Sequence, residues 1–140
     1  MAIVYLGLGS NLGDREKNIQ DAVTLLQQNQ FVVERLSSII ETDPVGFLEQ
    51  GKFLNAVMKG RTVLSAFELF DLTQSIEKQI GRKKIFVNGP RIIDIDILLY
   101  DKQKINTPHL NIPHPRMWER DFVMRPLKEV EPELFAESFL

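Results

Sequence analysis

The sequence predicts an α+β domain in which helices pack against one antiparallel sheet. Apolar runs typical of strands alternate with two longer segments of helical periodicity, and no internal repeat or inter-domain linker divides the chain. The order of these elements is strand, helix, strand, strand, helix, strand. This is the split βαβ order of ferredoxin-like folds, in which both helices cover one face of the sheet. The 140 residues fit a single domain, 1–140, with a buried core.

The first half of the chain predicts a strand, a helix and a second strand. Residues 2–8 alternate in hydropathy as a strand does, and residues 31–40 have the composition of a strand. Between them, residues 13–28 have helical periodicity, and Asp14 is the expected N-cap. The apolar stripe that should face the core consists of Ile19, Ala22, Val23 and Leu26.

The second half predicts two more strands around a second helix. Residues 52–61 and 91–100 are the expected strands, and residues 65–81 are the expected helix. Ser65 and Glu68 have the spacing of a capping box at the start of this helix.

The chain after residue 106 is a Pro-rich C-terminal extension. Short helical pieces are expected around residues 115–118 and 122–129. Because the two main helices cover one face of the predicted sheet, the other face is left for this extension or for a ligand.

Composition argues against several classes of function. The chain has no cysteine, which rules out disulfides and thiolate metal sites and is compatible with a reducing cytoplasm. A formal net charge of −2 argues against an electrostatic nucleic-acid binder. The N-terminus lacks the basic flank of a signal peptide, and no apolar run is long enough to span a bilayer. We therefore expect a cytoplasmic monomer that binds neither nucleic acid nor membranes.

Two aspartates lie inside the apolar run of the last predicted strand. Strand alternation places Asp94, Asp96 and Leu98 on one face. The opposite face should carry Ile93, Ile95, Ile97 and Leu99. Alternate residues are about 7 Å apart, so the two carboxylates repel each other unless a cation lies between them. Oxygen ligands without His or Cys suit Mg²⁺. On this pattern alone, a solvent-facing strand with two aspartates is an equally good explanation.

A basic segment precedes this strand. Residues 78–91 contain no acidic side chain and five basic ones, namely Lys78, Arg82, Lys83, Lys84 and Arg91. A polyphosphate site would explain this segment, and a solvated basic loop explains it at least as well. Arg91 follows a Gly-Pro turn and its guanidinium group suits bidentate phosphate contact, which favours the metal site over a solvent-facing strand for the two aspartates. His114 and Arg120 lie in a Pro-rich turn and are further candidate phosphate contacts. Gln74 and Glu77 lie one turn apart on the second helix, and a solvated face explains them equally well.

Two other segments could line a site. The Gly-rich segment 7–14 lacks the spacing of a dinucleotide fingerprint and the Gly-Lys-Ser/Thr of a Walker loop. We therefore interpret it as a tight turn in which Ser10 and Asn11 bond the local backbone. Phe53 and Asn55 share one face of a strand, where they could bind a flat heterocycle or simply pack within the sheet.

Five stretches, which cover nearly the whole chain, occur together in a characteristic order. They are LGLGSNLGD, ETDPVG with FLNAV, LTQSIEKQIGR, NGPRIIDIDILLYD and IPHPRMWERDFVMRPL. Together they resemble the 6-hydroxymethyl-7,8-dihydropterin pyrophosphokinase family of folate biosynthesis. The combination of GPR…DIDILL with PHPRM is the most specific part, and the fold of the family is the ferredoxin-like arrangement predicted above.

The resemblance implies transfer of pyrophosphate from ATP to the hydroxymethyl group of 6-hydroxymethyl-7,8-dihydropterin, with AMP as the second product. It also implies two Mg²⁺ ions as cofactors, held by Asp94 and Asp96. The residues implied in catalysis are Asp94, Asp96, Arg82 and Arg91. The residues implied in ATP binding are Gln74, Glu77, Lys84, Arg91, His114 and Arg120. The residues implied in pterin binding are Thr42, Pro44, Val45, Phe53, Asn55 and Phe122.

Two other classes of protein share parts of this pattern. A nucleotide cyclase or palm-type polymerase also carries paired metal-binding aspartates on a similar sheet, but it has no need of a pterin. An RRM-like RNA binder needs an aromatic pattern that residues 52–59 lack. In such a binder the two aspartates on the next strand would repel phosphate in the absence of a metal.

Overall fold

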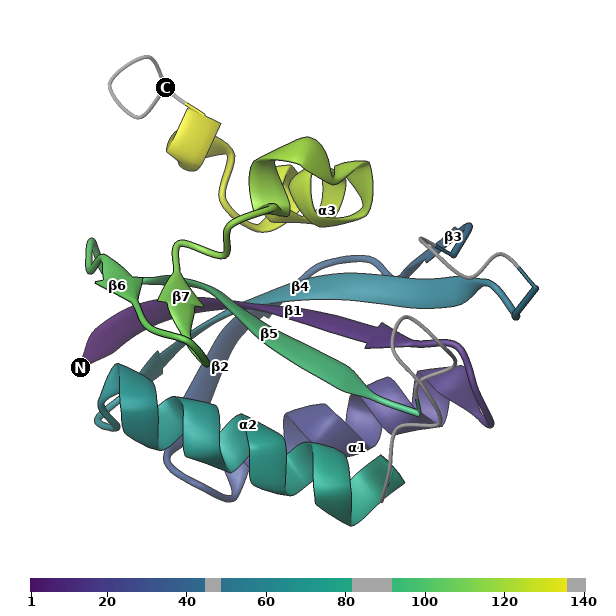
Figure 1. Ribbon diagram of the computed structural model, residues 1–140, viewed down its shortest axis with the longest axis horizontal. Helices are drawn as coiled ribbons and strands as arrows, with labels where there is room; N and C mark the ends of the chain where they lie inside the picture. The colour runs from purple at the N-terminus through teal and green to yellow at the C-terminus, as the bar shows by residue number, and fades with distance from the viewer. Residues whose placement is uncertain (45–48, 82–91, 136–140) are drawn as a thin grey trace.

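A five-stranded antiparallel sheet forms the centre of the molecule (Figure 1). The computed structural model describes residues 1–44, 49–81 and 92–135. Four strands follow one another across the sheet in the order β2-β4-β1-β5, and β3 pairs with β4. Their bounds are β1 (Ala2–Ser10), β2 (Phe31–Leu36), β3 (Ile40–Thr42), β4 (Phe53–Thr62) and β5 (Asp94–Tyr100). The order confirms the predicted ferredoxin-like topology.

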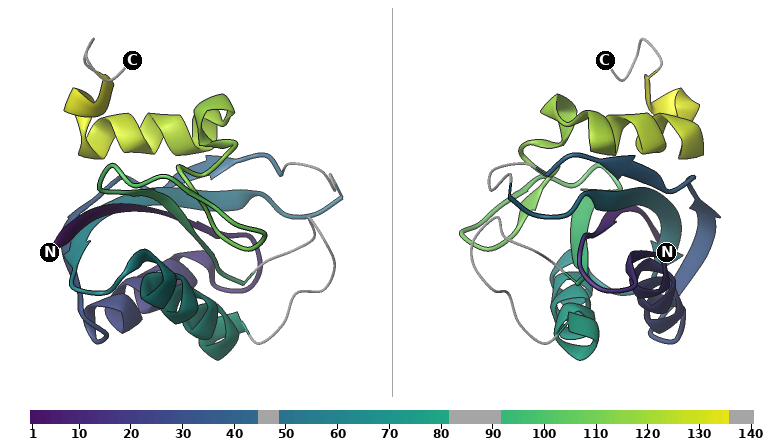
Figure 2. Two further views of the ribbon diagram at one scale, coloured as in Figure 1. Left: turned by 60° about the vertical axis from the view of Figure 1, so that its left-hand side comes forward. Right: turned by 90° about the vertical axis from the view of Figure 1, so that its right-hand side faces the viewer.

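Helices cover both faces of the sheet. Figures 1 and 2 show α1 (Arg15–Gln27) and α2 (Ala66–Gly81) together on one face and α3 (Asp121–Val130) on the other. Two short 3₁₀ helices, η1 (Met117–Glu119) and η2 (Pro132–Phe135), flank α3. The predicted C-terminal extension therefore occupies the second face. None of the helices among the described residues is long and apolar enough to cross a membrane.

The predicted signals at the starts of the helices are confirmed. The Asp14 side chain accepts a hydrogen bond from the Lys17 backbone N–H at 3.2 Å, as an N-cap does. Ser65 and Glu68 exchange bonds of 2.8 and 3.1 Å between side chain and backbone, which is the capping box. The predicted stripe of α1 is buried and consists of Ile19, Ala22, Val23 and Leu26.

The expectation of a single strand over residues 31–40 is wrong. The chain leaves the sheet after β2 and returns as β3, and Ser37 lies at the start of the break between them. Its hydroxyl accepts a bond from the Val57 backbone N–H, and its own N–H donates to the Val57 carbonyl, both at 2.9 Å. A hairpin of β6 (Ile105–Asn106) and β7 (Asn111–Ile112), which the sequence did not predict, lies beside β5.

The expectation that Leu99 shares a face with the isoleucines of β5 is also wrong. The register of β5 against β1 shifts between Tyr5 and Leu6, which leaves one extra residue on β5. Such a bulge reverses the alternation beyond it. Leu98 and Leu99 therefore both belong to the apolar cluster under α3, and Ile97 stays in the cluster under α1 and α2.

Gly60 allows the edge strand to lie close to β4. A Cβ atom at this position would lie 2.2 Å from Cε1 of Phe31 and 2.6 Å from the carbonyl oxygen of Val32. The Phe31 side chain is buried and cannot withdraw into solvent. The register of β2 with β4 thus depends on the absence of a side chain at residue 60.

We predict that Gly60→Ala destabilises the fold by about 1–3 kcal/mol, the usual cost of overpacking a filled core. Gly7→Ala on the neighbouring strand is the matched control, because its Cβ would meet Leu98 at an ordinary 3.5 Å. Urea unfolding of both variants measures the difference. Equal stability of the two variants would show that β2 can shift without cost.

Candidate active site

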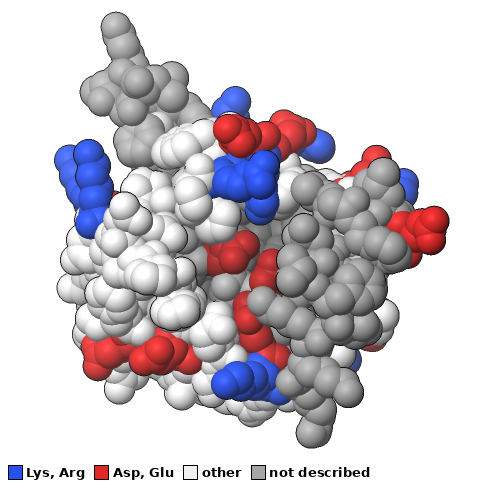
Figure 3. Space-filling model, in the orientation of Figure 1, with Lys and Arg blue, Asp and Glu red and all other residues white. Residues whose placement is uncertain are grey.

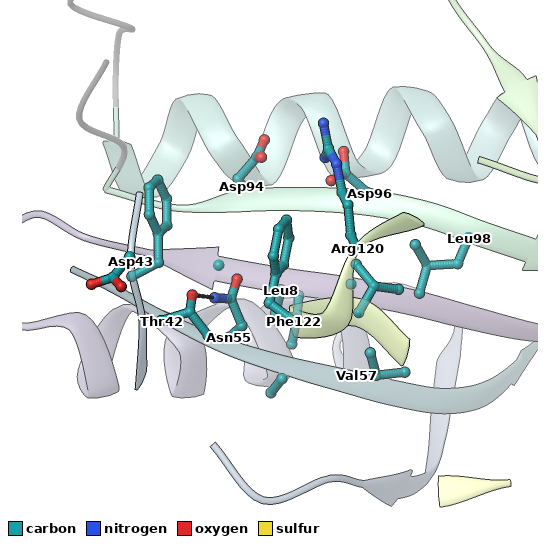
Figure 4. Close-up of a pocket in the computed structure, with 15 residues that line it drawn as sticks. Leu8, Thr42, Asp43, Asn55, Val57, Asp94, Asp96, Leu98, Arg120 and Phe122 are labelled. Atoms are coloured by element: carbon teal, nitrogen blue, oxygen red, sulfur yellow. Dashed lines mark hydrogen bonds between the residues drawn. The ribbon is translucent and has the colours of Figure 1, made fainter. Parts of the chain in front are cut away.

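A pocket opens on the sheet face that carries α3, beside the N-terminal end of that helix (Figure 4). We call it the sheet pocket. Its floor comes from β1, β4 and β5, one side comes from β3, and another from the start of α3. The residues that line it include Gly7, Gly9, Thr42, Asp43, Phe53, Asn55, Val57, Asp94, Asp96, Leu98, Arg120, Phe122 and Val123.

A second pocket lies along β5 between α2 and the segment that follows β6. We call it the edge pocket. The residues that line it are Phe70, Gln74, Glu77, Asp94, Ile95, Asp96, Ile97, His109, Leu110, Asn111, His114 and Pro115. Asp94 and Asp96 line both pockets and therefore stand at their boundary.

The pairing of β5 with β1 explains why both aspartates face the sheet pocket. Asp94 lies opposite Gly9, and Asp96 lies opposite Gly7. Glycine has no side chain, so the space between the carboxylates and β4 stays open. Figure 3 shows carboxylates gathered in a hollow near the middle of this side of the molecule. Both aspartates are half-buried, where interactions between charges are stronger than in bulk water.

The two aspartates have the chemistry of a magnesium site completed by a substrate. Across residues 1–44, 49–81 and 92–135, no group of three or more His, Cys, Asp or Glu side chains could hold a metal alone. Mg²⁺ commonly binds one or two carboxylates and completes its shell with water and phosphate oxygens. Asp94 and Asp96 fit this requirement, whereas a dedicated zinc site would need more protein ligands.

The start of β5 is held by α2. The Glu77 carboxylate accepts a hydrogen bond of 2.8 Å from the Ile95 backbone N–H, between the two aspartates. Glu77, predicted to lie near a nucleotide, is therefore also a structural partner of β5. Gln74 lies one turn earlier and lines the same edge pocket.

His114 lies in the edge pocket with a lowered pKa. Burial is the main cause, the positive charge of Arg120 lowers the pKa further, and Asp94 acts in the opposite direction. The imidazole is therefore neutral at neutral pH. A neutral ring can donate one hydrogen bond to a phosphate oxygen without adding charge.

A hydrogen-bonded amide forms one wall of the sheet pocket. Nδ2 of Asn55 donates to Oγ1 of Thr42 at 2.6 Å (Figure 4). The short strand β3 makes this possible, because it places Thr42 opposite Phe53 on β4. With one N–H of Nδ2 bound to Thr42, Asn55 keeps its amide oxygen and its second N–H for a ligand. That oxygen would lie 3.0 Å from a Cβ atom on Gly9.

The Asn11 side chain bonds a segment distant in the sequence, whereas bonds to the local backbone were expected. Its Nδ2 donates to Oε1 of Gln50 at 2.7 Å and to the Gly51 carbonyl at 3.0 Å. The Ser10 hydroxyl accepts a bond of 3.2 Å from the side chain of Asn18, whereas a bond to the local backbone was expected. The Gly-rich turn therefore also ties down the segment that leads into β4.

Arg15 strengthens this connection from the start of α1. It forms a salt bridge of 2.9 Å with Glu41 of β3. It also donates to the Lys52 carbonyl, just before β4, at 2.8 Å. The strands that carry Thr42 and Asn55 are thus held by contacts with the Gly-rich turn and the start of α1.

Arg120 and Phe122 come from the two positions around the start of α3. The guanidinium carbon of Arg120 lies 5.5 Å from the centroid of the Phe122 ring, within cation–π range. Arg120, expected at the nucleotide with His114, lines the sheet pocket instead of the edge pocket. It stands near the boundary that Asp96 marks in Figure 4.

The predicted site residues separate into two groups in space. Thr42, Phe53, Asn55 and Phe122 line the sheet pocket, whereas Gln74, Glu77 and His114 line the edge pocket. Pro44 follows Asp43 but does not line either pocket. The predicted positions Val45, Arg82, Lys84 and Arg91 lie outside the described residues.

Several lining residues were not among the predicted ones. Gly7 and Gly9 could have been found, because they alternate on a strand that pairs with the one bearing the aspartates. The other edge-pocket residues had no signal of their own, since they come from one turn of α2 and from the short segment around β7. They are Phe70, His109, Leu110 and Asn111.

Comparison with a solved structure supports the fold. The chain aligns over 99% of its length with a structure described as HPPK-DHPS in complex with substrates, at a TM-score of 0.66 and 15% identity. It spans 41% of that longer chain. At this level of identity the likeness establishes only the fold.

Comparison with curated sequences is more specific. The chain is 50% identical over 137 residues to the 2-amino-4-hydroxy-6-hydroxymethyldihydropteridine pyrophosphokinase of Bacillus subtilis (strain 168), which covers 97% of this chain and 82% of the relative. It is 47% identical to the enzyme of the same name from Aquifex aeolicus (strain VF5), over 96% of this chain and 83% of the relative. A mitochondrial folate synthesis bifunctional protein of Arabidopsis thaliana is 42% identical over 91% of this chain, which spans 23% of that protein.

The family signature covers almost all of the described sheet and both pockets. The matched segment, residues 5–132, begins in β1 and ends at the start of η2, and it includes the two aspartates and the lining residues around them. The chain belongs to the 7,8-dihydro-6-hydroxymethylpterin-pyrophosphokinase (HPPK) family.

Proposed function

We propose that this protein transfers a pyrophosphoryl group from ATP to 6-hydroxymethyl-7,8-dihydropterin, a step of folate biosynthesis. The observation that carries the proposal is that Asp94 and Asp96 line two adjoining pockets of different character. Two substrates that meet at the aspartates require such an arrangement. The family match favours this reaction over the cyclase, polymerase and RNA-binding alternatives.

The sheet pocket suits the pterin. Phe53 and Phe122 offer aromatic faces for a flat heterocycle, and Gly9 places no side chain in the pocket. The oxygen of Asn55, oriented by the bond to Thr42, can accept a hydrogen bond from an N–H group on the ring edge. We also propose Pro44 and Val45 as pterin contacts, on the resemblance alone, and we propose that the protein acts as a monomer.

The edge pocket suits the nucleotide. Phe70 and Leu110 provide apolar surface for a base, and the amides of Gln74 and Asn111 provide polar groups for its edge. His114 lines the same pocket as Asp94 and Asp96, and we propose that it contacts the phosphates. Glu77 completes the wall on α2. The further phosphate contacts that we propose are Arg82, Lys84, Arg91 and Arg120.

The proposed reaction exchanges one phosphorus–oxygen bond for another. The hydroxymethyl oxygen bonds to the β-phosphorus, the bond from that phosphorus to the oxygen shared with the α-phosphorus breaks, and AMP leaves. The hydroxyl proton is released. Catalysis of such a transfer consists mainly of positioning and charge stabilisation.

Asp94 and Asp96 are the residues that would hold Mg²⁺, and we propose two ions. Bound there, the metal would offset phosphate charge and make the attacking hydroxyl more acidic. The aspartates themselves define where the two substrates meet, because both pockets end at them. Arg82 and Arg91 are proposed to balance charge on the transferred group.

Product analysis tests the proposed reaction. The protein is incubated with ATP, Mg²⁺ and 6-hydroxymethyl-7,8-dihydropterin, and the nucleotides and pterins are separated. We expect AMP and pterin diphosphate in equal amounts. Formation of ADP, or of cyclic nucleotide, would contradict the proposal.

We predict that Asp94→Asn and Asp96→Asn each lower turnover by orders of magnitude without lowering stability. Metal stabilisation of transferring phosphates is worth several kcal/mol, whereas loss of one carboxylate relieves repulsion in the metal-free site. Thermal melts in EDTA and turnover at saturating Mg²⁺ measure the two effects. Asp71→Asn, at an exposed position of α2, is the matched control and should retain both properties. An active variant that melts early would assign the aspartates a structural role.

We predict that Phe122→Ala weakens pterin binding by about 1–3 kcal/mol, the range found for loss of one stacked aromatic face. ATP binding should stay near the wild-type value, because Phe122 lines the sheet pocket and not the edge pocket. Separate titrations of the two ligands make the comparison. Phe67→Ala is the control, since that ring is 51% exposed on α2 and lines neither pocket. A loss shared equally by both ligands would make Phe122 a general packing residue.

We predict that Gly9→Ala weakens pterin binding about tenfold, which corresponds to about 1.4 kcal/mol. The added methyl group would lie 3.0 Å from the Asn55 oxygen and force that amide to move. Gly7→Ala should have a smaller effect, because its nearest neighbour is Leu98 at 3.5 Å. Titration of the pterin against both variants checks this order, and a reversed order would mean that Asn55 does not recognise the ring.

A further inference from the structure

The C-terminal end of α3 is tied to the sheet by three consecutive residues. Oε1 of Glu129 accepts hydrogen bonds from the backbone N–H and the hydroxyl of Ser38, at 2.9 and 2.8 Å. The carbonyl of Val130 accepts a bond of 2.8 Å from Nη1 of Arg35. These contacts join the helix to β2 and to the break between β2 and β3.

The third residue, Glu131, is buried under the helix end. Its carboxylate accepts a hydrogen bond from the Tyr5 hydroxyl at 3.0 Å and forms a salt bridge with Lys59. Tyr5 and Lys59 are direct partners in the ladder between β1 and β4. The side chains of Lys59 and Glu131 are 16% and 9% exposed, so the ion pair is largely shielded from solvent. The Lys59 ammonium is the main reason that the pKa of Glu131 is lowered, against the effect of burial.

A buried ion pair is poorly explained by stability alone. Removing two charges from water costs about as much as their attraction returns, and apolar side chains of similar size often stabilise as well or better. The distinctive property of the pair is direction, because apolar contacts tolerate sliding and a hydrogen-bonded carboxylate does not. The contact therefore suits a part of the molecule whose position matters.

The opposite end of α3 forms part of the sheet pocket. Arg120 is its N-cap residue, Phe122 lies in its first turn, and both line the pocket. The cap makes no side-chain hydrogen bond, and Pro126 lacks the N–H that would bond to the Phe122 carbonyl. The first turn of α3, which borders the pocket, therefore has fewer hydrogen bonds within the helix than a regular capped turn. A helix of 10 residues is about 15 Å long, so a small rotation at its anchored end displaces the pocket wall.

We propose that Glu131, through its contacts with Lys59 and Tyr5, is a positioning residue that sets the place of α3 and so holds Phe122 and Arg120 over the sheet pocket. Figure 2 shows α3 lying across the sheet on the face away from α1 and α2, where it is the one α-helix among the described residues. The expected loss of pterin affinity rests on the proposed pterin site. The expected change in the position of α3 does not depend on which ligand binds.

The test compares variants that remove the charge in different ways. Glu131→Ala leaves Lys59 unpaired, and the double variant Lys59→Met with Glu131→Leu removes both charges together. Asp21→Asn is the matched control, because it removes an exposed ion pair with Lys17 on α1, on the other face of the sheet. Each protein is titrated separately with 6-hydroxymethyl-7,8-dihydropterin and with a non-hydrolysable ATP analogue in Mg²⁺, and each is melted thermally.

We expect both Glu131 variants to bind the pterin at least fivefold more weakly, with ATP affinity within twofold of the wild type. The double variant should melt within a few degrees of the wild type, so its loss cannot come from unfolding. Asp21→Asn should change neither affinity. Wild-type pterin affinity in the folded double variant would overturn the proposal, as would equal weakening of both ligands.

A second measurement separates this proposal from the identity of the substrate. Trp118 is the single tryptophan of the chain and lies in η1, directly before α3. Without any ligand, acrylamide quenching of Trp118 and amide hydrogen exchange in α3 should both increase in the double variant but not in Asp21→Asn. Unchanged quenching and exchange would overturn the positioning role. If these increase while the wild type does not bind the pterin, the proposed substrate fails and the role of Glu131 stands.

Discussion

The antiparallel pairing of β5 with β1 is the constraint on which the rest of the site depends. It sets Asp94 against Gly9 and Asp96 against Gly7, so two carboxylates and two open backbone positions lie on the same face. The isoleucines that alternate with them enter the core beneath and hold the strand against α1 and α2. A slip of one residue would bury the aspartates and expose the isoleucines, and both changes are unfavourable. The apolar core thereby determines where the charges stand.

The bulge near Leu98 serves the opposite half of the molecule. It turns Leu98 and Leu99 toward α3 and so extends the apolar surface on which that helix packs. One strand therefore supplies core residues to both faces of the sheet and charged residues to the sheet pocket. The glycines make this compatible with a ligand, because side chains at their positions would fill the space above the sheet. The two pockets meet at the aspartates as a direct result of this geometry.

Polar contacts between distant segments hold the walls of the sheet pocket. On one side, Arg15 and Asn11 tie the first turn of the chain to β3 and to the residues before β4. On the other side, Glu131 ties the end of α3 to β1 and β4. Each contact joins residues far apart in the sequence and consists of hydrogen bonds or a salt bridge. Such contacts are well suited to positioning, since their strength depends on direction and distance.

The sequence by itself determined the order of the long elements, the caps at Asp14 and Ser65, and the aspartate face of β5, because periodicity and capping are local properties. It also indicated that Phe53, Asn55 and Phe122 belong to a site, through the resemblance of whole motifs. It did not determine the break at Ser37, the bulge that turned Leu99, or the partition of the site into two pockets. Those features depend on hydrogen bonds and packing between segments tens of residues apart, and only the tertiary structure brings those segments together.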